Sequence, residues 1–123
     1  MPRINQREAK SLCDNFISKK SNALDQIIGK EDSNAIWFDI NDLEKFFTYV
    51  KVEAINQNQE INGIRVYLGS YDQNHINKNL ANMTTVFLTA TIDGEKKMEN
   101  SDDLNSDAFN MGNNGVPPKR FFK

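Results

Sequence analysis

The chain has 123 residues, a formal net charge of −2 and a hydrophobic share of 38%. This length is typical of one domain, and eight Phe, three Tyr and one Trp supply enough aromatic area for a core. The nearly balanced charge gives no electrostatic reason to expect a nucleic-acid partner. We therefore expect a single domain over residues 1–123, with an irregular polar segment from about residue 99.

Cysteine usage and the first residues bear on the compartment. Cys13 is the one cysteine, so neither an internal disulfide nor a cysteine-based zinc cluster can form within one chain. The opening "MPRINQREAK" has no apolar core and no small-residue cleavage site. No apolar run approaches the roughly 20 residues that span a bilayer. We expect a cytoplasmic protein that does not bind membranes.

Residues 6–28 have the pattern of an amphipathic helix. Apolar residues recur at helical spacing on one face: Ala9, Leu12, Cys13, Phe16 and Ile17. The polar "SKKSN", residues 18–22, predicts a bend or a break, with Ser21 or Asn22 capping a second piece. Gly29 is a natural end for this helix because glycine accepts positive φ without a steric penalty.

The next two elements are a short strand and a second helix. The run "AIWFD", residues 35–39, is rich in β-formers and predicts a buried strand. Asp39 can cap the following helix, with Asp42 in its first turn, and a capping box of Asn41 and Glu44 is the alternative. An apolar face at helical spacing continues this helix toward residue 56: Leu43, Phe46, Phe47 and Val50.

Two longer strands follow. Residues 61–71, "INGIRVYLGSY", alternate between an apolar row and a second row. The apolar row is Ile64, Val66 and Leu68, and the second row is Arg65, Tyr67 and Gly69. Residues 84–93, "TTVFLTATID", alternate in the same way, with Val86, Leu88 and Ala90 on one face. Asp93-Gly94 predicts a turn, from which "EKKM" returns as a short edge strand.

This order of elements predicts an α+β fold. We expect a small, mostly antiparallel sheet of three to four strands, with the N-terminal and central helices packed on one face. The other face carries Arg65, Tyr67, Phe87 and the threonines. The predicted elements cover that face incompletely, so the tail, a second copy or a partner should lie on it.

Four blocks in order carry a resemblance: "IWFDINDLEKFF", "GIRVYLGSY", "TTVFLTAT" and "FNMGNNGVPP". This arrangement resembles a group of small uncharacterised proteins common in Bacteroidetes. It spans residues 35–118, and its motifs are moderately specific as an ordered set and weak singly. The resemblance implies a cytoplasmic bacterial protein in which the strand from Arg65 to Tyr71 and the Gly/Pro-rich tail belong to one design. It implies no activity.

The catalytic and metal motifs that the chain suggests are all incomplete. Cys13 lies on an apolar helix face, where a small hydrophobe is favoured over a reactive thiol. His75 has no nucleophile signature to serve, so a solvated loop residue is favoured. The calcium-loop pattern fails at Ile76 and Asn77, and "GNNG" is followed by prolines that forbid an immediate helix. We assign no catalytic residue, metal or cofactor, and binding is favoured over catalysis.

Arg65, Tyr67 and Tyr71 are the strongest binding candidates. An arginine in mid-strand needs acceptors from a carboxylate, from backbone carbonyls or from a ligand. A side-chain ladder with an acidic partner for Arg65 is the favoured interpretation. A ligand-binding or protein-binding patch is the second, and direct catalysis is the third.

The tail is the second candidate region. Asn110 and the neighbouring glycines permit positive φ, and Pro117-Pro118 impose an extended backbone. With Phe109 as an apolar anchor, we expect an ordered turn that pins the tail against the polar-aromatic face of the sheet. The final "KRFFK" then places Phe121 and Phe122 either in an exposed contact patch or folded back on the core.

The main functional hypothesis is a protein–protein interaction or accessory module. Its partner is another protein or a second copy, bound through the open sheet face or an edge strand. A role in neutralising or assisting a co-encoded partner is an analogy. The predicted binding residues are Arg65, Tyr67, Tyr71, Asn110, Phe121 and Phe122.

The alternative is a small-molecule-binding protein or an unrecognised enzyme. It uses Arg65 to hold an anionic group, with Tyr67, Tyr71, His75 and Asn110 around it. This alternative predicts a concave pocket at Arg65, with convergent polar groups. It also predicts that Arg65 has no internal carboxylate partner.

Overall fold

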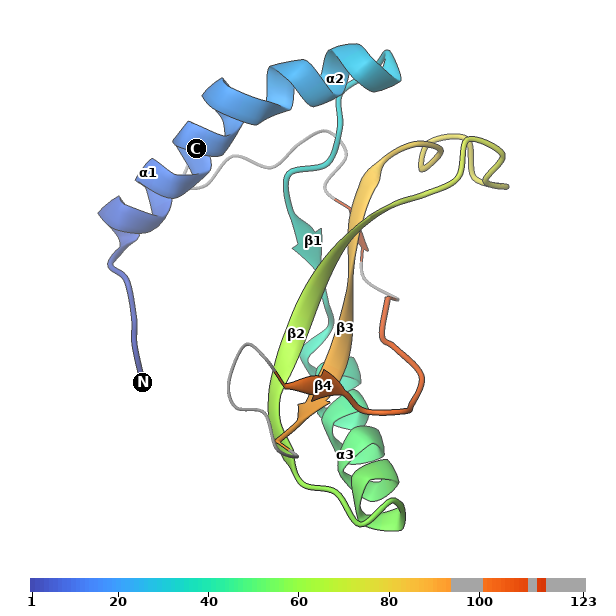
Figure 1. Cartoon of the computed structure of the whole chain (residues 1–123). Helices are drawn as coiled ribbons and strands as arrows, with labels where there is room; N and C mark the ends of the chain where they lie inside the picture. The colour runs from blue at the N-terminus through green and yellow to red at the C-terminus, as the bar shows by residue number, and fades with distance from the viewer. Residues whose placement is uncertain (94–100, 111–112, 115–123) are drawn as a thin grey trace. The chain divides into compact units, whose positions relative to one another are not determined.

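The structure is a computed structural model that describes residues 1–93, 101–110 and 113–114 (Figure 1). The α+β prediction is confirmed, because the chain combines helices with a three-stranded antiparallel sheet in the order β2-β3-β4. The predicted edge strand "EKKM" lies outside the described residues. In the described part of the chain, no helix is both long and apolar enough to cross a membrane.

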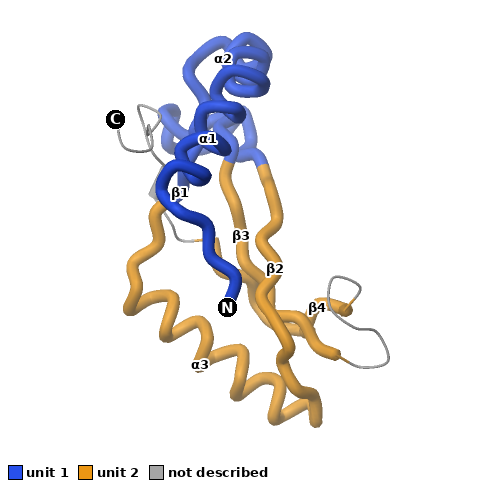
Figure 2. Tube along the Cα trace, turned by 90° about the vertical axis from the view of Figure 1, so that its left-hand side faces the viewer, with its two compact units in different colours: residues 1–36, 70–84, 114–123 blue, residues 37–69, 85–113 orange. Residues whose placement is uncertain are grey.

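The chain divides into two compact units, each assembled from separate segments (Figure 2). The first unit comprises residues 1–36, 70–84 and 114–123, and the second comprises residues 37–69 and 85–113. Strands β2 (Ile61–Ser70) and β3 (Thr84–Ile92) each have one end residue in the first unit. Nearly all of the sheet therefore belongs to the second unit.

The first unit opens with the predicted helix. It comprises α1 (Gln6–Phe16), a π-helical segment (Ile17–Ser21) and α2 (Asn22–Ile28). Asn5 and Glu8 form a capping box at the start, since each side chain bonds the backbone N–H of the other residue. The irregularity expected at residues 18–22 is therefore a π-helical segment within a continuous helix.

Of the two boundaries predicted for the second part of this helix, the end is confirmed and the start is not. Ser21 makes no capping hydrogen bond and keeps helical dihedral angles, so the predicted second cap is wrong. Gly29 ends α2 with φ of 77°, as its freedom at positive φ predicted. Cys13 is half-buried, and none of the residues in the three helical segments is fully buried.

A buried carboxylate organises the first unit beyond its helix. Asp32 accepts the Thr84 backbone N–H at 2.6 Å and the Thr84 hydroxyl at 2.5 Å. It also accepts the N–H of Ser33 at 2.8 Å. Asp25 in α2 accepts the N–H of Asp32 at 2.7 Å. These bonds join the segment after α2 to the start of β3, and the sequence analysis did not identify them.

The predicted strand at residues 35–39 is shorter and less buried than expected. Within this range, only Ile36–Trp37 form a strand, β1, which pairs with β5 (Asn113–Asn114). Trp37 is largely exposed, so the prediction of a buried strand is wrong. The reason is that β1 belongs to a two-stranded pair rather than to the larger sheet.

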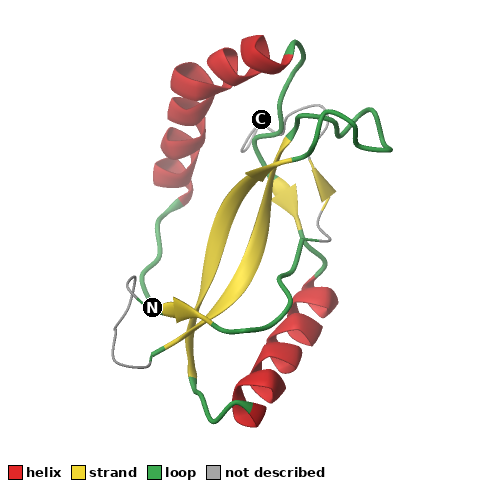
Figure 3. Cartoon of the chain, turned by 45° about the vertical axis from the view of Figure 1, so that its right-hand side comes forward, coloured by secondary structure: helices red, strands yellow, loops and turns green. Residues whose placement is uncertain are grey.

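In the second unit, α3 (Ile40–Asn56) starts at the predicted cap. Asp39 accepts the N–H groups of Asn41 and Asp42 at 2.8 and 3.1 Å. The chain's longest strands, β2 and β3, run side by side in the sheet (Figure 3), and β3 lies between β2 and β4 (Asp102–Asp103). In the pairing of β3 with β4, Thr91 lies opposite Asp103.

The hydrophobic core lies between α3 and the β3 side of the sheet. It contains residues of α3, of β3 and of the segment after β4: Phe46, Val50, Ala54, Leu88, Ala90 and Leu104. Phe109 packs against this core and forms an antiparallel bridge with Leu88. The segment after residue 99, predicted to be irregular, thus supplies core residues.

Strand β2 alternates as predicted, but its exposure is the reverse of our expectation. The apolar row is open, with Ile64, Val66 and Leu68 exposed by 38%, 58% and 81%. Arg65 and Tyr67 on the other row are half-buried. The reason is the position of α3 along the width of the sheet. Helix α3 packs over β3 and the segment after β4, so β2 lies at the edge of the covered area.

Candidate functional site

Arg65 and Tyr67 meet on Asp103. The Arg65 guanidinium donates from Nη1 to Oδ1 of Asp103 at 2.7 Å and from Nη2 to the Ser101 carbonyl at 2.9 Å. The Tyr67 hydroxyl donates to Oδ2 of Asp103 at 2.5 Å. Thr89 of β3 donates to Oδ1 at 2.9 Å. This is the side-chain ladder with an acidic partner that we favoured from the sequence.

The ladder shifts the ionisation of its two charged groups. Burial raises the pKa of Asp103, but hydrogen bonds from Tyr67 and Thr89 and the charge of Arg65 outweigh it and hold that pKa below its ordinary value. The pKa of Arg65 is raised by its hydrogen bond with Tyr67 and, against burial, by the charge of Asp103. Both groups are therefore held in their charged forms.

The same face continues past Arg65. Asn62 donates to the Ser101 hydroxyl at 2.7 Å and accepts from the Thr91 hydroxyl at 2.6 Å. Tyr67 stacks on Phe87 with ring centroids 5.0 Å apart. Together these contacts hold residues 101–103 against β2 and β3, so a structural role accounts for the ladder.

Sequence reasoning missed Asp103. A mid-strand arginine signals that an acid should approach it. The segment "NSDDLNSD" offers three carboxylates, and nothing local distinguishes the one that reaches the sheet. The choice depends on the pairing of β4 with β3.

Tyr71 and His75 form a small cluster in the first unit. The Tyr71 N–H donates to the Met83 carbonyl at 3.0 Å, and its ring contacts the His75 ring edge-on at 5.0 Å. His75 Nδ1 accepts the Asn77 N–H at 3.0 Å. This local hydrogen bond is typical of a loop histidine. Within the described ranges, no group of three or more His, Cys, Asp or Glu could hold a metal ion.

The described part of the tail lies along β3. Asn110 donates from its side-chain amide to the Val86 carbonyl at 2.8 Å. Phe109 stacks on Phe46 at 5.4 Å and contacts Phe38 at 5.1 Å. Phe109 is thus an anchor, but on the α3 side of the sheet and not on the polar-aromatic face that we expected. Phe121 and Phe122 lie outside the described residues.

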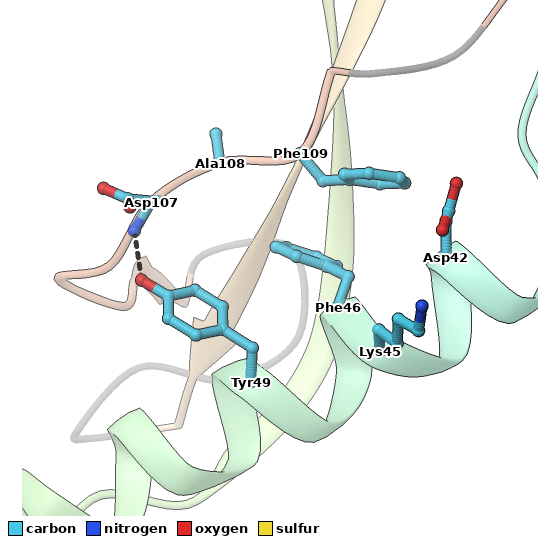
Figure 4. A pocket seen from close by; sticks show the side chains of 7 residues that line it. All are labelled: Asp42, Lys45, Phe46, Tyr49, Asp107, Ala108 and Phe109. Carbon is cyan, nitrogen blue, oxygen red and sulfur yellow. Dashed lines mark hydrogen bonds between the residues drawn. The ribbon is translucent and has the colours of Figure 1, made fainter.

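An open groove of about 550 Å³ lies beside these aromatic rings (Figure 4). Its walls come from one face of α3 and from the segment before Asn110: Asp42, Lys45, Phe46, Tyr49, Asp107, Ala108 and Phe109. The Tyr49 hydroxyl accepts the Asp107 N–H at 3.0 Å. The small-molecule alternative predicted a concavity at Arg65, whereas the groove that the described residues form lies at α3.

The outer edge of β2 is the second open surface. The Tyr71 N–H donates to the carbonyl of Met83, the residue before β3. In an antiparallel strand, the backbone groups of alternate residues point to the same neighbouring strand, so the odd-numbered residues of β2 bond to β3. In β3, the even-numbered residues Leu88 and Ala90 bond to Phe109 and Leu104, on the side away from β2. The odd-numbered residues of β3 are therefore the ones that face β2, in agreement with the direction of Tyr71. The backbone groups of Ile64, Val66 and Leu68 therefore point to the outer edge, where no described strand pairs with them.

This edge therefore has two features in one strand: backbone groups with which no described strand pairs, and exposed aliphatic side chains. The resemblance to the Bacteroidetes group, which rests on blocks in order, stays a prediction. Comparisons of the chain with protein-family models, curated proteins and solved structures found no match.

Proposed function

We propose that the chain is a cytoplasmic bacterial protein-binding module that works through the outer edge of β2. The observation that carries the proposal is the coincidence, in one ten-residue strand, of an open backbone edge and an exposed apolar row. By analogy with other small chains, an accessory role beside a co-encoded partner fits such a module.

The chemistry of this edge suits an extended protein segment. A strand added beside β2 would satisfy the outward N–H and C=O groups with which no described strand pairs. Its side chains would also cover part of the row of Ile64, Val66 and Leu68. Burying one aliphatic side chain contributes about 1.5–3 kcal/mol, so three of them supply a useful driving force.

Arg65 enters this proposal as a supporting residue. Its guanidinium already binds the Asp103 carboxylate and the Ser101 carbonyl, so we propose no anion site there. Its role is to hold β2 in the sheet and thereby keep the outer edge extended.

Affinity capture from the source cells tests the proposal. Wild type would be compared with Leu68→Asp and with Ile76→Asp, a matched change at an almost fully exposed loop position. We expect one stoichiometric protein with wild type and Ile76→Asp, and loss of that protein with Leu68→Asp. Equal capture by all three folded baits would remove β2 as the working surface.

A small-molecule site in the groove beside α3 is the second candidate. The observation that favours it is that Asp42, Lys45 and Asp107 line an aromatic groove without an ion pair among the described residues. Such a site would suit a compact zwitterion with an apolar body. Fragment binding measured by NMR should be weakened by Lys45→Ala and unchanged by Lys51→Ala, which alters another lysine of α3. A screen without hits in the groove would end this candidate.

A further inference from the structure

We infer that β2 binds β2 of a second copy of this chain, antiparallel and about a two-fold axis at Val66. The inference rests on the proposed function, since it names the protein that the outer edge of β2 takes. The two copies would then share one continuous sheet through their paired β2 strands.

Among the described residues, no strand covers the outer edge of β2, and the sequence of that edge has little of the protection that is typical of edge strands. Natural edges are protected by prolines, lysines, bulges or a very short strand. Strand β2 has ten residues and no proline or lysine. From Ile64 onward its outward positions carry Ile64, Val66, Leu68 and Ser70, none of which is charged. A net charge of −2 adds little repulsion between copies.

The register follows from hydrogen bonding and charge. Outward residues must pair with outward residues, so the axis falls on a residue and not between two. An axis at Arg65 would place the two arginines opposite each other, which is unfavourable. An axis at Tyr67 would place Ile64 opposite Ser70 and leave part of the apolar row without an apolar partner.

An axis at Val66 keeps the two Arg65 side chains apart and gives each exposed aliphatic residue an aliphatic partner. Ile64 then faces Leu68 of the second copy, Val66 faces Val66, and Arg65 faces Tyr67. The exposed aliphatic residues of both copies form one patch on the α3 side of the sheet, while the polar ladders lie on the other side. One strand per copy makes a small interface, so we expect a reversible dimer at the weak end of specific complexes.

Cysteine cross-linking tests this register. Val66→Cys and Leu68→Cys would each be made in a Cys13→Ala background and oxidised. At the proposed axis the two Cα atoms of residue 66 lie about 5.5 Å apart, within disulfide range. The two Cα atoms of residue 68 are offset by four residues, or about 13 Å along the strands at roughly 3.3 Å a residue, and so lie about 14 Å apart. We expect a covalent dimer from Val66→Cys and little from Leu68→Cys, although Leu68 is the more exposed.

Sedimentation velocity on the unmodified chain is the companion measurement. We expect a concentration-dependent dimer that Val66→Lys abolishes and Ile76→Lys preserves, with folding checked by circular dichroism. A monomer at all concentrations overturns the inference, as does cross-linking of Leu68→Cys at least as fast as Val66→Cys. A monomer whose Leu68→Cys thiol resists a maleimide also overturns it, because the row is then covered within the chain.

These outcomes are distinguishable from failure of the proposed function. A monomeric chain that still captures a partner through Leu68 would keep the protein-binding module and reject the second copy. A monomeric chain whose capture is insensitive to Leu68→Asp would reject both.

Discussion

The hydroxyl of Tyr67 donates to the carboxylate of Asp103 at 2.5 Å, across 36 positions of the chain. This bond joins the middle of β2 to a two-residue strand at the far side of β3. Because Arg65 and Thr89 bind the same carboxylate, one acidic side chain ties the three strands together. The row that looked most functional in the sequence is thereby used within the fold.

Asp103→Asn should make the chain less stable at neutral pH and less sensitive to acid. The folded pKa of Asp103 lies below its unfolded value, so its contribution is present above the unfolded pKa and is lost as pH falls through the folded pKa. With solvent screening of this partly exposed group, we expect a loss of about 1 kcal/mol at pH 7. The difference should shrink below about pH 4.

Urea unfolding of wild type and variant at pH 7 and pH 3 measures this effect. Asp107→Asn, a change of the same kind in the same segment, is the control and should leave stability nearly unchanged. A difference for Asp103→Asn that is equally large at both pH values would show that the charge of the carboxylate is not its source.

Asp32→Ala should be more damaging than a matched change at the surface. Removing the buried carboxylate leaves the Thr84 N–H and hydroxyl without their acceptor, which costs about 1–3 kcal/mol in the free energy of unfolding. Asp72→Ala removes an exposed acceptor of the Asn74 N–H and should cost clearly less. Comparable losses in the two variants would contradict an anchoring role for Asp32.

Two adjacent phenylalanines of α3 should respond differently to truncation. Phe46 is 6% exposed and contacts Phe109, whereas Phe47 is 36% exposed. We expect Phe46→Ala to lower the free energy of unfolding by about 3–5 kcal/mol, and Phe47→Ala to lower it by less than half as much. Thermal and denaturant unfolding of the two variants provide the comparison, and a larger loss at Phe47 would place the core elsewhere.

Alanine substitutions at two glycines should distinguish the effect of backbone strain from that of steric contact. At Gly29 an added Cβ would meet nothing within 4 Å, but φ is 77°. Gly29→Ala should therefore destabilise the chain by about 1 kcal/mol through the backbone alone. At Gly69 the Cβ would meet Thr85 and Phe87 at ordinary distances of 3.7–3.9 Å. Gly69→Ala should be neutral or slightly stabilising, and the opposite order in melting temperature would refute this reasoning.

Local pattern was a good guide to the elements. The helix from Gln6, the cap at Asp39, the end at Gly29 and the alternation along β2 were all predictable, because each depends on residues within a few positions. The same reasoning misjudged residues 35–39. Their β-propensity is real, but burial of Trp37 would require a large sheet around it.

The candidate surfaces were less predictable. Arg65 and Tyr67 were correctly grouped on one face, but the sequence could not reveal that both would donate hydrogen bonds to the carboxylate of Asp103. The groove beside α3 also escaped notice, because it joins Tyr49 to Asp107 and Phe109 across more than fifty positions.

The amino-acid sequence by itself determined the helices, the two long strands and the alternation of their faces, since these follow from short-range periodicity and capping. Only the tertiary structure decided which face of β2 is covered. That outcome depends on the lateral position of α3 over Leu88 and Leu104 and on the long-range pairing of β4 with β3. Local patterns carry no information on such placements, because a strand with one apolar row is equally compatible with burying that row or leaving it open to a partner.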